Sequence, residues 1–186
     1  MFADNRSKKI IILAHCLLNQ NSISDGTADC PSQFREIIDL IMKNQIGILQ
    51  LPCPEVMCLG LDRGDRQGGK RQVLEENTRI GNLMSEMVNQ KLLRVKAEEV
   101  ATLIQDYRSY GFRVIGVVGI NRSPSCGIET TTKDNAEEKG KGVFMGLISE
   151  AFAKRAQNIM MIGVKTSEIK ESVMKLKQFI HKEKDG

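Results

Sequence analysis

Four short, unbroken apolar runs most constrain how this chain can fold. They lie at residues 9–14, 46–51, 113–119 and 158–162. An apolar run that does not alternate with polar residues is typical of a strand buried on both faces, as in a parallel sheet. We therefore expect four buried parallel strands.

Segments with helical spacing separate these runs. Spacing of three or four positions between apolar residues predicts helices with one apolar face. Four stretches have it: Phe34, Ile37, Ile38 and Ile41; Val100, Leu103, Ile104 and Tyr107; Phe144, Leu147, Ile148, Ala151 and Phe152; Ile169, Val173, Leu176 and Ile180. A longer helix is expected over residues 72–93, with a break near Gly81.

Single residues predict where three of these helices begin or end. Pro31 is expected near the first turn of the first helix, where proline is tolerated. Gly111 is expected to end the second helix, and Ser167 to cap the start of the fourth.

The alternation of strands and helices predicts an α/β fold. We expect a single Rossmann-like domain over residues 1–186, with a mostly parallel sheet of about four strands flanked by helices. Residues 52–71 interrupt the alternation, because they are rich in Gly and Arg and lack clear periodicity. Connections of this length are often functional, so this segment is expected to be an irregular loop near a site.

The charge pattern gives little support to a nucleic-acid partner. The formal net charge is +4 and the basic residues are spread along the chain, which is too little to indicate nucleic acid by itself. The densest basic segment, RGDRQGGKR at residues 63–71, is either a phosphate contact or a solvated loop. The scarcity of aromatic residues argues against a base-stacking surface.

The chain also lacks the sequence signals of a membrane or secreted protein. No stretch approaches the ~18 apolar residues that a membrane span needs. The first apolar run is too short for the core of a signal peptide. We therefore expect a cytoplasmic protein with reduced thiols and no membrane partner.

Three of the five cysteines follow strand ends. Cys16, Cys53 and Cys126 come shortly after the first, second and third apolar runs. Right-handed crossovers place the carboxyl ends of parallel strands on one edge of the sheet, where ligands bind. Three converging thiols favour a soft metal or an iron–sulfur cluster, and three protein ligands leave one position open. The competing interpretation is that they are small core residues.

The other two cysteines have less informative positions. Cys30 precedes Pro31 at a predicted helix start and is expected to pack rather than bind metal. Cys58 lies five residues after Cys53. It is a fourth ligand, a thiol that supports the other ligands, or a packing residue.

Three sequence blocks around these cysteines resemble a known family. HCLL at residues 15–18, PCPE at 52–55 and RSPSCG at 122–127 are similar to the signature blocks of the 2-thiouracil desulfurase (TudS) family, and Asp25-Gly26 resembles its Asp-Gly. The resemblance implies a [4Fe–4S] cluster held by Cys16, Cys53 and Cys126, with one iron free of protein ligands. It also implies removal of sulfur from a thiocarbonyl on a nucleobase-like ring.

The chain departs from that family at several positions. His15, Met57, Cys58 and residues 19–21 differ from the usual pattern, as does LDRGDRQGGKRQ at residues 61–72. These departures indicate a divergent branch of TudS-related desulfidases. The resemblance to the family therefore supports the cluster better than it supports the substrate.

The expected function is that of an iron–sulfur-dependent, non-redox desulfurase that releases sulfide from a small thiolated compound. Glu55 is expected to act as the base that takes a proton from water. Ser123 is expected to bond the substrate or the tetrahedral intermediate. The resemblance makes Asp25 a substrate-binding residue, and Ser125 is assigned the same role.

Structural interpretations of these residues stay open. Glu55 could simply begin a helical turn, Ser123 and Ser125 could cap backbone amides, and Asp25 could be a turn residue. His15 either bonds a backbone carbonyl, or tunes the cluster or moves a proton.

Two other functions compete with the desulfurase. A metal- or cluster-binding sensor or sulfur-handling module without turnover would be favoured if Cys58 closed the site. A nucleotide-binding domain would need a glycine-rich loop after the first strand, and AHCLLNQNS stands there instead.

Overall fold

The computed structural model describes residues 2–182, so Met1 and residues 183–186 of the predicted 1–186 domain lie outside it. Within the described residues, four parallel strands form one sheet in the order β2-β1-β3-β6. The strands are β1 (Lys9–Leu13), β2 (Gly47–Gln50), β3 (Arg113–Ile120) and β6 (Met161–Val164). The predicted α/β class and parallel sheet are confirmed.

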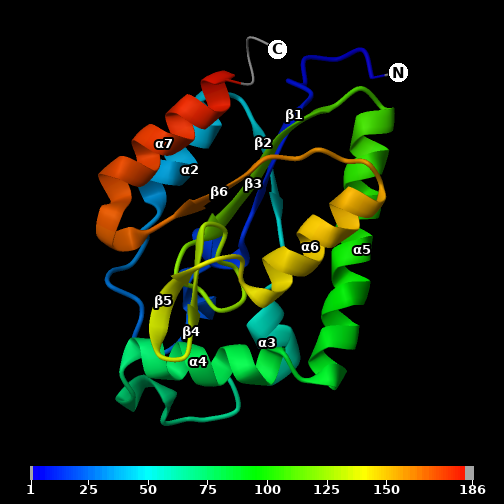
Figure 1. Cartoon of the computed structure of the whole chain (residues 1–186). Coiled ribbons are helices and arrows are strands. Elements are labelled where there is room, and N and C mark those ends of the chain that lie inside the picture. Colours follow the sequence, from blue (N-terminus) through cyan, green and yellow to red (C-terminus); the bar gives the residue numbers. More distant parts are fainter. Residues whose placement is uncertain (1, 183–186) are drawn as a thin grey trace.

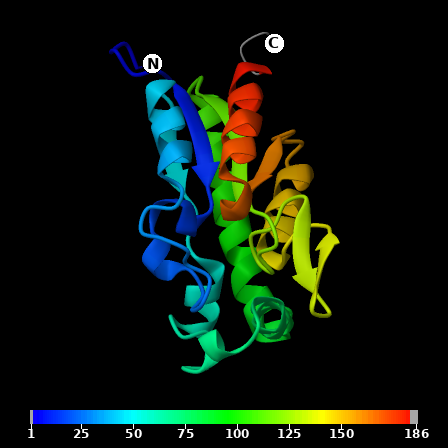
Figure 2. The same ribbon diagram turned by 90° about the vertical axis from the view of Figure 1, so that its left-hand side faces the viewer.

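Helices cover both faces of this sheet. Helices α2 (Arg35–Lys43) and α7 (Ile169–Lys182) lie on one face, and α5 (Met87–Ser109) and α6 (Val143–Lys154) on the other (Figure 1). Figure 2 looks onto the face that α2 and α7 cover, with α5 behind the sheet. The core lies between sheet and helices, since β1 is almost wholly buried and α5 buries Leu93, Ala97, Ala101 and Ile104 at helical spacing. Among the described residues, no helix is both long and apolar enough to cross a membrane.

A bulge in β3 fits the sheet to α7. The pairing of β3 with β1 shifts register between Ile10 and Ile12, and Gly116 there has a φ of +153°. A Cβ atom at Gly116 would lie 2.3 Å from the ring of Phe179 on α7. Glycine therefore permits both the bulge and the close approach of the helix.

The expected helix over residues 72–93 is divided later than predicted. Helix α4 (Val73–Met84) passes through Gly81 without a break, and α5 begins at Met87 and continues to Ser109. The side chains of Asn89 and Gln90 donate to the carbonyls of Leu83 and Met84. These bonds satisfy carbonyls that α4 leaves free at its end, which stabilises the turn there.

The helix-end signals were correct only in part. Gly111 ends α5 in a left-handed conformation, as predicted. Pro31 lies four residues before α2 begins at Arg35, so it precedes the first turn rather than standing in it. Ser167 lies inside a short 3₁₀ turn, η3 (Thr166–Glu168), that comes before α7.

A hairpin between β3 and α6 was not predicted. Strands β4 (Thr130–Lys133) and β5 (Ala136–Lys139) pair antiparallel, and Asp134 and Asn135 turn the chain with positive φ. The sequences TTTK and AEEK lack apolar alternation, so hydrophobic periodicity could not reveal them.

Short elements occupy the loops at the carboxyl ends of the strands. They are α1 (His15–Leu18) and η1 (Gln20–Ser22) after β1, and α3 (Pro54–Leu59) and η2 (Gly68–Lys70) after β2. The segment 52–71, expected to be irregular, therefore begins with a helix. Helix α4 crosses below this edge of the sheet, far from both chain ends (Figure 1).

Candidate functional site

The carboxyl ends of β1, β2 and β3 converge on one cavity. In the order β2-β1-β3, the chain goes from β1 to β2 on one side of β1 and then crosses to β3 on its other side. Ligands of parallel α/β sheets bind at the carboxyl ends of the strands where the strand order reverses in this way. Cys16 follows β1, Cys53 follows β2 and Cys126 follows β3. All three line the same cavity, whose volume is about 80 Å³. The structure therefore brings the three predicted thiols together.

Two of these thiols affect each other's ionisation. The neighbouring Cys16 thiol is the main cause that lowers the pKa of Cys53 to about 7, and Cys53 in turn raises the pKa of Cys16. The Val56 backbone N–H at the start of α3 also lowers the pKa of Cys53. Burial raises the pKa of the third thiol, Cys126. Cys53 is therefore the thiol that loses its proton most easily.

The loop that carries Cys126 is held by its own residues and by α6. The Ser123 hydroxyl accepts a hydrogen bond from the Cys126 backbone N–H at 3.0 Å. The backbone N–H groups of Phe144 and Met145 donate to the Ser125 carbonyl. A Cβ atom at Gly127 would lie 2.1 Å from the Thr130 carbonyl oxygen, so only glycine allows this close packing. The SPSCG sequence thus fixes Cys126 against the sheet.

Glu55 is buried beside the thiols, and both of its carboxylate oxygens accept hydrogen bonds. Its Oε1 accepts a hydrogen bond from the Ser125 hydroxyl at 2.5 Å. Its Oε2 accepts one from the Ser24 hydroxyl at 3.2 Å and forms an ion pair with the Arg63 guanidinium at 3.1 Å. These contacts fix the carboxylate at the cavity wall and offset its charge.

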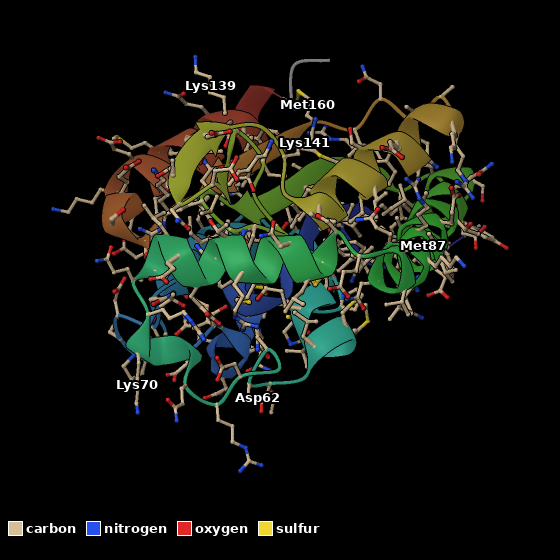
Figure 3. The ribbon with its side chains drawn as sticks, turned by 60° about the horizontal axis from the view of Figure 1, so that its bottom comes forward. Asp62, Lys70, Met87, Lys139, Lys141 and Met160 are labelled. Carbon is tan, nitrogen blue, oxygen red and sulfur yellow. The ribbon has the colours of Figure 1, made fainter. Side chains whose placement is uncertain are left out.

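Arg63 is a site residue that the sequence analysis missed. Its side chain is only 3% exposed, and it also donates to the carbonyls of Leu61 and Ser22. By contrast, Asp62 just before the basic segment and Lys70 within it point outward (Figure 3). The Gly- and Arg-rich composition indicated that the segment is a functional loop. No periodicity in the sequence showed which of its arginines turns inward.

A network of charges holds the loop that carries Arg63. Arg79 on α4 donates to the Arg63 carbonyl at 2.9 Å and forms an ion pair with Glu76 at 2.6 Å. Arg71 forms ion pairs with Glu76 and Asp65 at 2.9 and 2.6 Å. Arg63 and Arg71 of the basic segment 63–71 are therefore paired within the chain, whereas Arg66 and Lys70 are exposed, as expected for a solvated loop.

The predicted serine and aspartate residues have different positions. Ser123 and Ser125 both line the cavity, and their hydroxyl oxygens lie 3.3 Å apart. Ser125 is almost fully buried and its hydroxyl faces Glu55. Asp25 is exposed, lies outside the cavity lining and packs against the backbone at Gly69. The structure therefore does not bring Asp25 to the thiols.

His15 also lines the cavity, and its ring is oriented by two contacts. Nδ1 lies 3.2 Å from the Leu51 carbonyl oxygen, and Nε2 lies 3.3 Å from the Asn19 side-chain nitrogen. A carbonyl can only accept and an amide nitrogen can only donate, so these contacts assign the proton to Nδ1. His15 thus bonds a backbone carbonyl, as one of the two interpretations expected.

The remaining cysteines lie outside the cavity lining. Cys58 is on α3, half-buried, and burial raises the pKa of its thiol. Cys30 is exposed. Among the described residues that line the cavity, the cysteines are Cys16, Cys53 and Cys126. Cys58 therefore does not join these three cysteines in the cavity lining as a fourth ligand would.

The donor set fits a cluster by its chemistry. Within residues 2–182, no three side chains of His, Cys, Asp or Glu are arranged to hold a single metal ion. An iron–sulfur cluster does not need its ligands to meet at one ion, because each thiolate binds its own iron and inorganic sulfide fills the space between the irons. Three cysteine thiols on one cavity wall are donors of the kind that such a cluster takes.

Comparisons with known proteins give distant likenesses. No family model matches the chain. It is 29% identical over 157 residues to an uncharacterized protein of Methanocaldococcus jannaschii, and the match covers 84% of this chain and 83% of that protein. A solved structure that it resembles is the [4Fe-4S]-dependent thiouracil desulfidase TudS, with a TM-score of 0.40 and 18% identity over 91% of this chain and 99% of that one.

Proposed function

We propose that this protein is an iron–sulfur-dependent desulfurase that converts a thiocarbonyl of a small thiolated compound to a carbonyl and releases sulfide. One observation carries the proposal. Three thiols from three strand ends line one cavity together with Glu55, whose buried carboxylate is held by Arg63 and Ser125. A core of small residues would not need a buried ion pair beside its cysteines, because burying charge costs free energy.

Cys16, Cys53 and Cys126 would hold the cluster. When bound, a cluster with one iron free of protein ligands supplies a soft Lewis acid that polarises a thiocarbonyl carbon toward water. The reaction balances without an electron donor, since a thiocarbonyl and water give a carbonyl and hydrogen sulfide.

Glu55 would take a proton from the attacking water. Each carboxylate oxygen has two lone pairs, so Oε1 can accept this proton while it still accepts the Ser125 hydrogen bond. Arg63 fixes the orientation of the carboxylate and offsets its charge. The adjacent hydroxyls of Ser125 and Ser123 give a route for returning the proton toward the leaving sulfide.

Ser123 would also donate a hydrogen bond to the substrate. Its oxygen accepts from the Cys126 N–H, so its own hydroxyl proton is free to donate to a group in the cavity or to the Ser125 oxygen. A donor aimed at the thiocarbonyl sulfur, on which negative charge develops as water adds, would lower the barrier to water addition.

The first test is cluster content in protein purified without oxygen. We expect about four irons and four sulfides per chain, the composition of a cubane. Cys126→Ser should lose both, whereas Cys30→Ser, at an exposed thiol outside the cavity, should keep both. A reversed result, with the cluster kept in Cys126→Ser, would show that the assigned ligands are wrong.

Sulfide release from thiolated nucleobases separates the enzyme from its alternative. We expect turnover in the wild type and its loss in Glu55→Gln, with the iron content unchanged. A loaded wild-type protein that releases no sulfide from any thiolated compound would favour the sensor or sulfur-handling module. An active Glu55→Gln protein would remove the role of Glu55 as base.

A further inference from the structure

The cavity lining contains a buried hydrogen-bond donor without a partner. Gln33 lines the cavity, and its side-chain Nε2 is shielded from solvent with no hydrogen-bond partner in the described part of the chain. Buried polar groups are nearly always paired, and leaving one unpaired costs free energy. An unpaired donor beside a candidate active site therefore points to a ligand.

The orientation of this amide is fixed by its other end. The Gln33 Oε1 accepts a hydrogen bond from the Asp29 backbone N–H at 3.1 Å. A backbone N–H can only donate, so the oxygen of the amide faces Asp29 and the NH₂ group faces away from it. The unpaired atom is thus a donor.

The position of Gln33 is also fixed. Its backbone N–H donates to the Gln20 side chain at 3.0 Å, and the next residue, Phe34, is almost fully buried and lines the same cavity. A donor held in place before a ligand arrives loses little entropy when the ligand binds. Such a residue is suited to distinguishing one substrate from another.

We propose that Gln33 determines specificity by donating a hydrogen bond from Nε2 to a carbonyl oxygen of the substrate. This rests on the proposed desulfurase function and narrows its substrate class. The substrate is a ring that carries, besides the thiocarbonyl, a second carbonyl oxygen that accepts the bond. The apolar side chains of Ile23 and Phe34, which line the cavity beside Gln33, are suited to the faces of such a ring.

The test compares two substrates in cluster-loaded protein. 2-Thiouracil has a ring carbonyl and pyrimidine-2-thione lacks it. We expect Gln33→Met to lower the ratio of their kcat/KM values about tenfold relative to the wild type, the effect of one hydrogen bond to a neutral group. Intrinsic differences in reactivity between the substrates cancel in this comparison. A ratio unchanged by the substitution would overturn the proposal.

Two further variants separate recognition from folding. Gln33→Glu keeps an oxygen for the Asp29 N–H and removes the amide donor, so it should lose the preference for 2-thiouracil as Gln33→Met does. Gln20→Met loosens the same backbone but removes no donor from the cavity lining, and the ratio should remain that of the wild type. A Gln33→Glu protein that retains the wild-type preference would contradict the inference.

A binding measurement gives a readout without turnover. Calorimetric titration with uracil and with pyrimidin-2-one should show a preference for uracil that Gln33→Met loses. If Gln33→Met instead changes the visible spectrum of the cluster and leaves both preferences intact, the amide serves the cluster and the proposal is wrong. Wild-type protein that releases no sulfide but prefers uracil would refute the desulfurase and keep Gln33 as a recognition residue.

Discussion

At the scale of single residues, the buried pair of Glu55 and Arg63 is the feature with the largest energetic consequence. Replacing Arg63 by Met would leave the Glu55 carboxylate buried without its counter-charge. We expect the free energy of unfolding to fall by about 3–5 kcal/mol, as for other buried pairs that lose one partner. Urea denaturation at pH 7 would measure this loss.

Arg66 provides the matched control for Arg63. It lies three residues away, its side chain is 93% exposed, and its contact with Asp62 is 4.0 Å. Arg66→Met should change the free energy of unfolding by less than about 0.5 kcal/mol. Equal effects of the two substitutions would show that the buried pair does not stabilise the fold.

Glu76 makes stability depend on pH. Hydrogen bonds from Arg79, and to a lesser extent from Arg71, lower the pKa of Glu76 from its usual 4.5. A carboxylate with a lowered folded-state pKa contributes stability above its unfolded pKa and loses it as the pH falls through the folded value. The stability difference between wild type and Glu76→Gln should be constant near pH 7 and shrink below pH 4.5. Denaturation curves at several pH values would detect a difference that instead grows on acidification.

At the scale of elements, the bulge in β3 and the packing of α7 depend on each other. Gly116→Ala would place a Cβ atom 2.3 Å from the Phe179 ring and 2.6 Å from the Met160 carbonyl oxygen. We expect a loss of about 1–3 kcal/mol of stability, the usual cost of overpacking. Thermal unfolding of the purified variant would measure it.

Gly146 in α6 provides a control for which the same substitution should raise the stability. A Cβ atom there would meet nothing within 4 Å, and alanine favours a helix over glycine by about 0.5–1 kcal/mol. Gly146→Ala should therefore raise the melting temperature while Gly116→Ala lowers it. Destabilisation by both would mean that the space around Gly116 is not what limits substitution.

The periodicity of the sequence predicted the elements well and their ends less well. The apolar runs located the strands of the sheet, but β6 begins three residues later than its run, and β2 is only partly buried although it was expected to be buried. The start of α5 depended on the Asn89 and Gln90 side chains bonding the end of α4, which no apolar pattern encodes. The β4–β5 hairpin was missed because its strands are polar.

The candidate site was predictable where it followed from topology. Parallel strands share an edge, so three cysteines after three strands had to come close. Arg63, Gln33 and the contacts of Glu55 depend on which side chains of irregular loops turn inward. The exposed position of Asp25 depends in the same way on the packing of its turn against Gly69.

At the scale of the whole molecule, a group bound by three strand ends should stabilise the entire fold. A ligand that binds the folded chain and not the unfolded one adds stability equal to RT ln(1 + L/Kd), where L is its free concentration and Kd its dissociation constant. Removing the iron with a chelator should lower the melting temperature of the wild type by about 5–10 °C. The Cys126→Ser protein, treated in the same way, should show no change. A wild-type melting temperature that the chelator leaves unaltered would argue against a group shared by the three strands.

The anchoring of the Cys126 loop by α6 has a consequence for biosynthesis. The Ser125 carbonyl accepts from the first N–H groups of α6, a helix that is translated after all three cysteines. A nascent chain that has just exposed Cys126 lacks this anchor. Iron delivered during translation would therefore meet an incomplete site, and maturation should follow release of α6 from the ribosome.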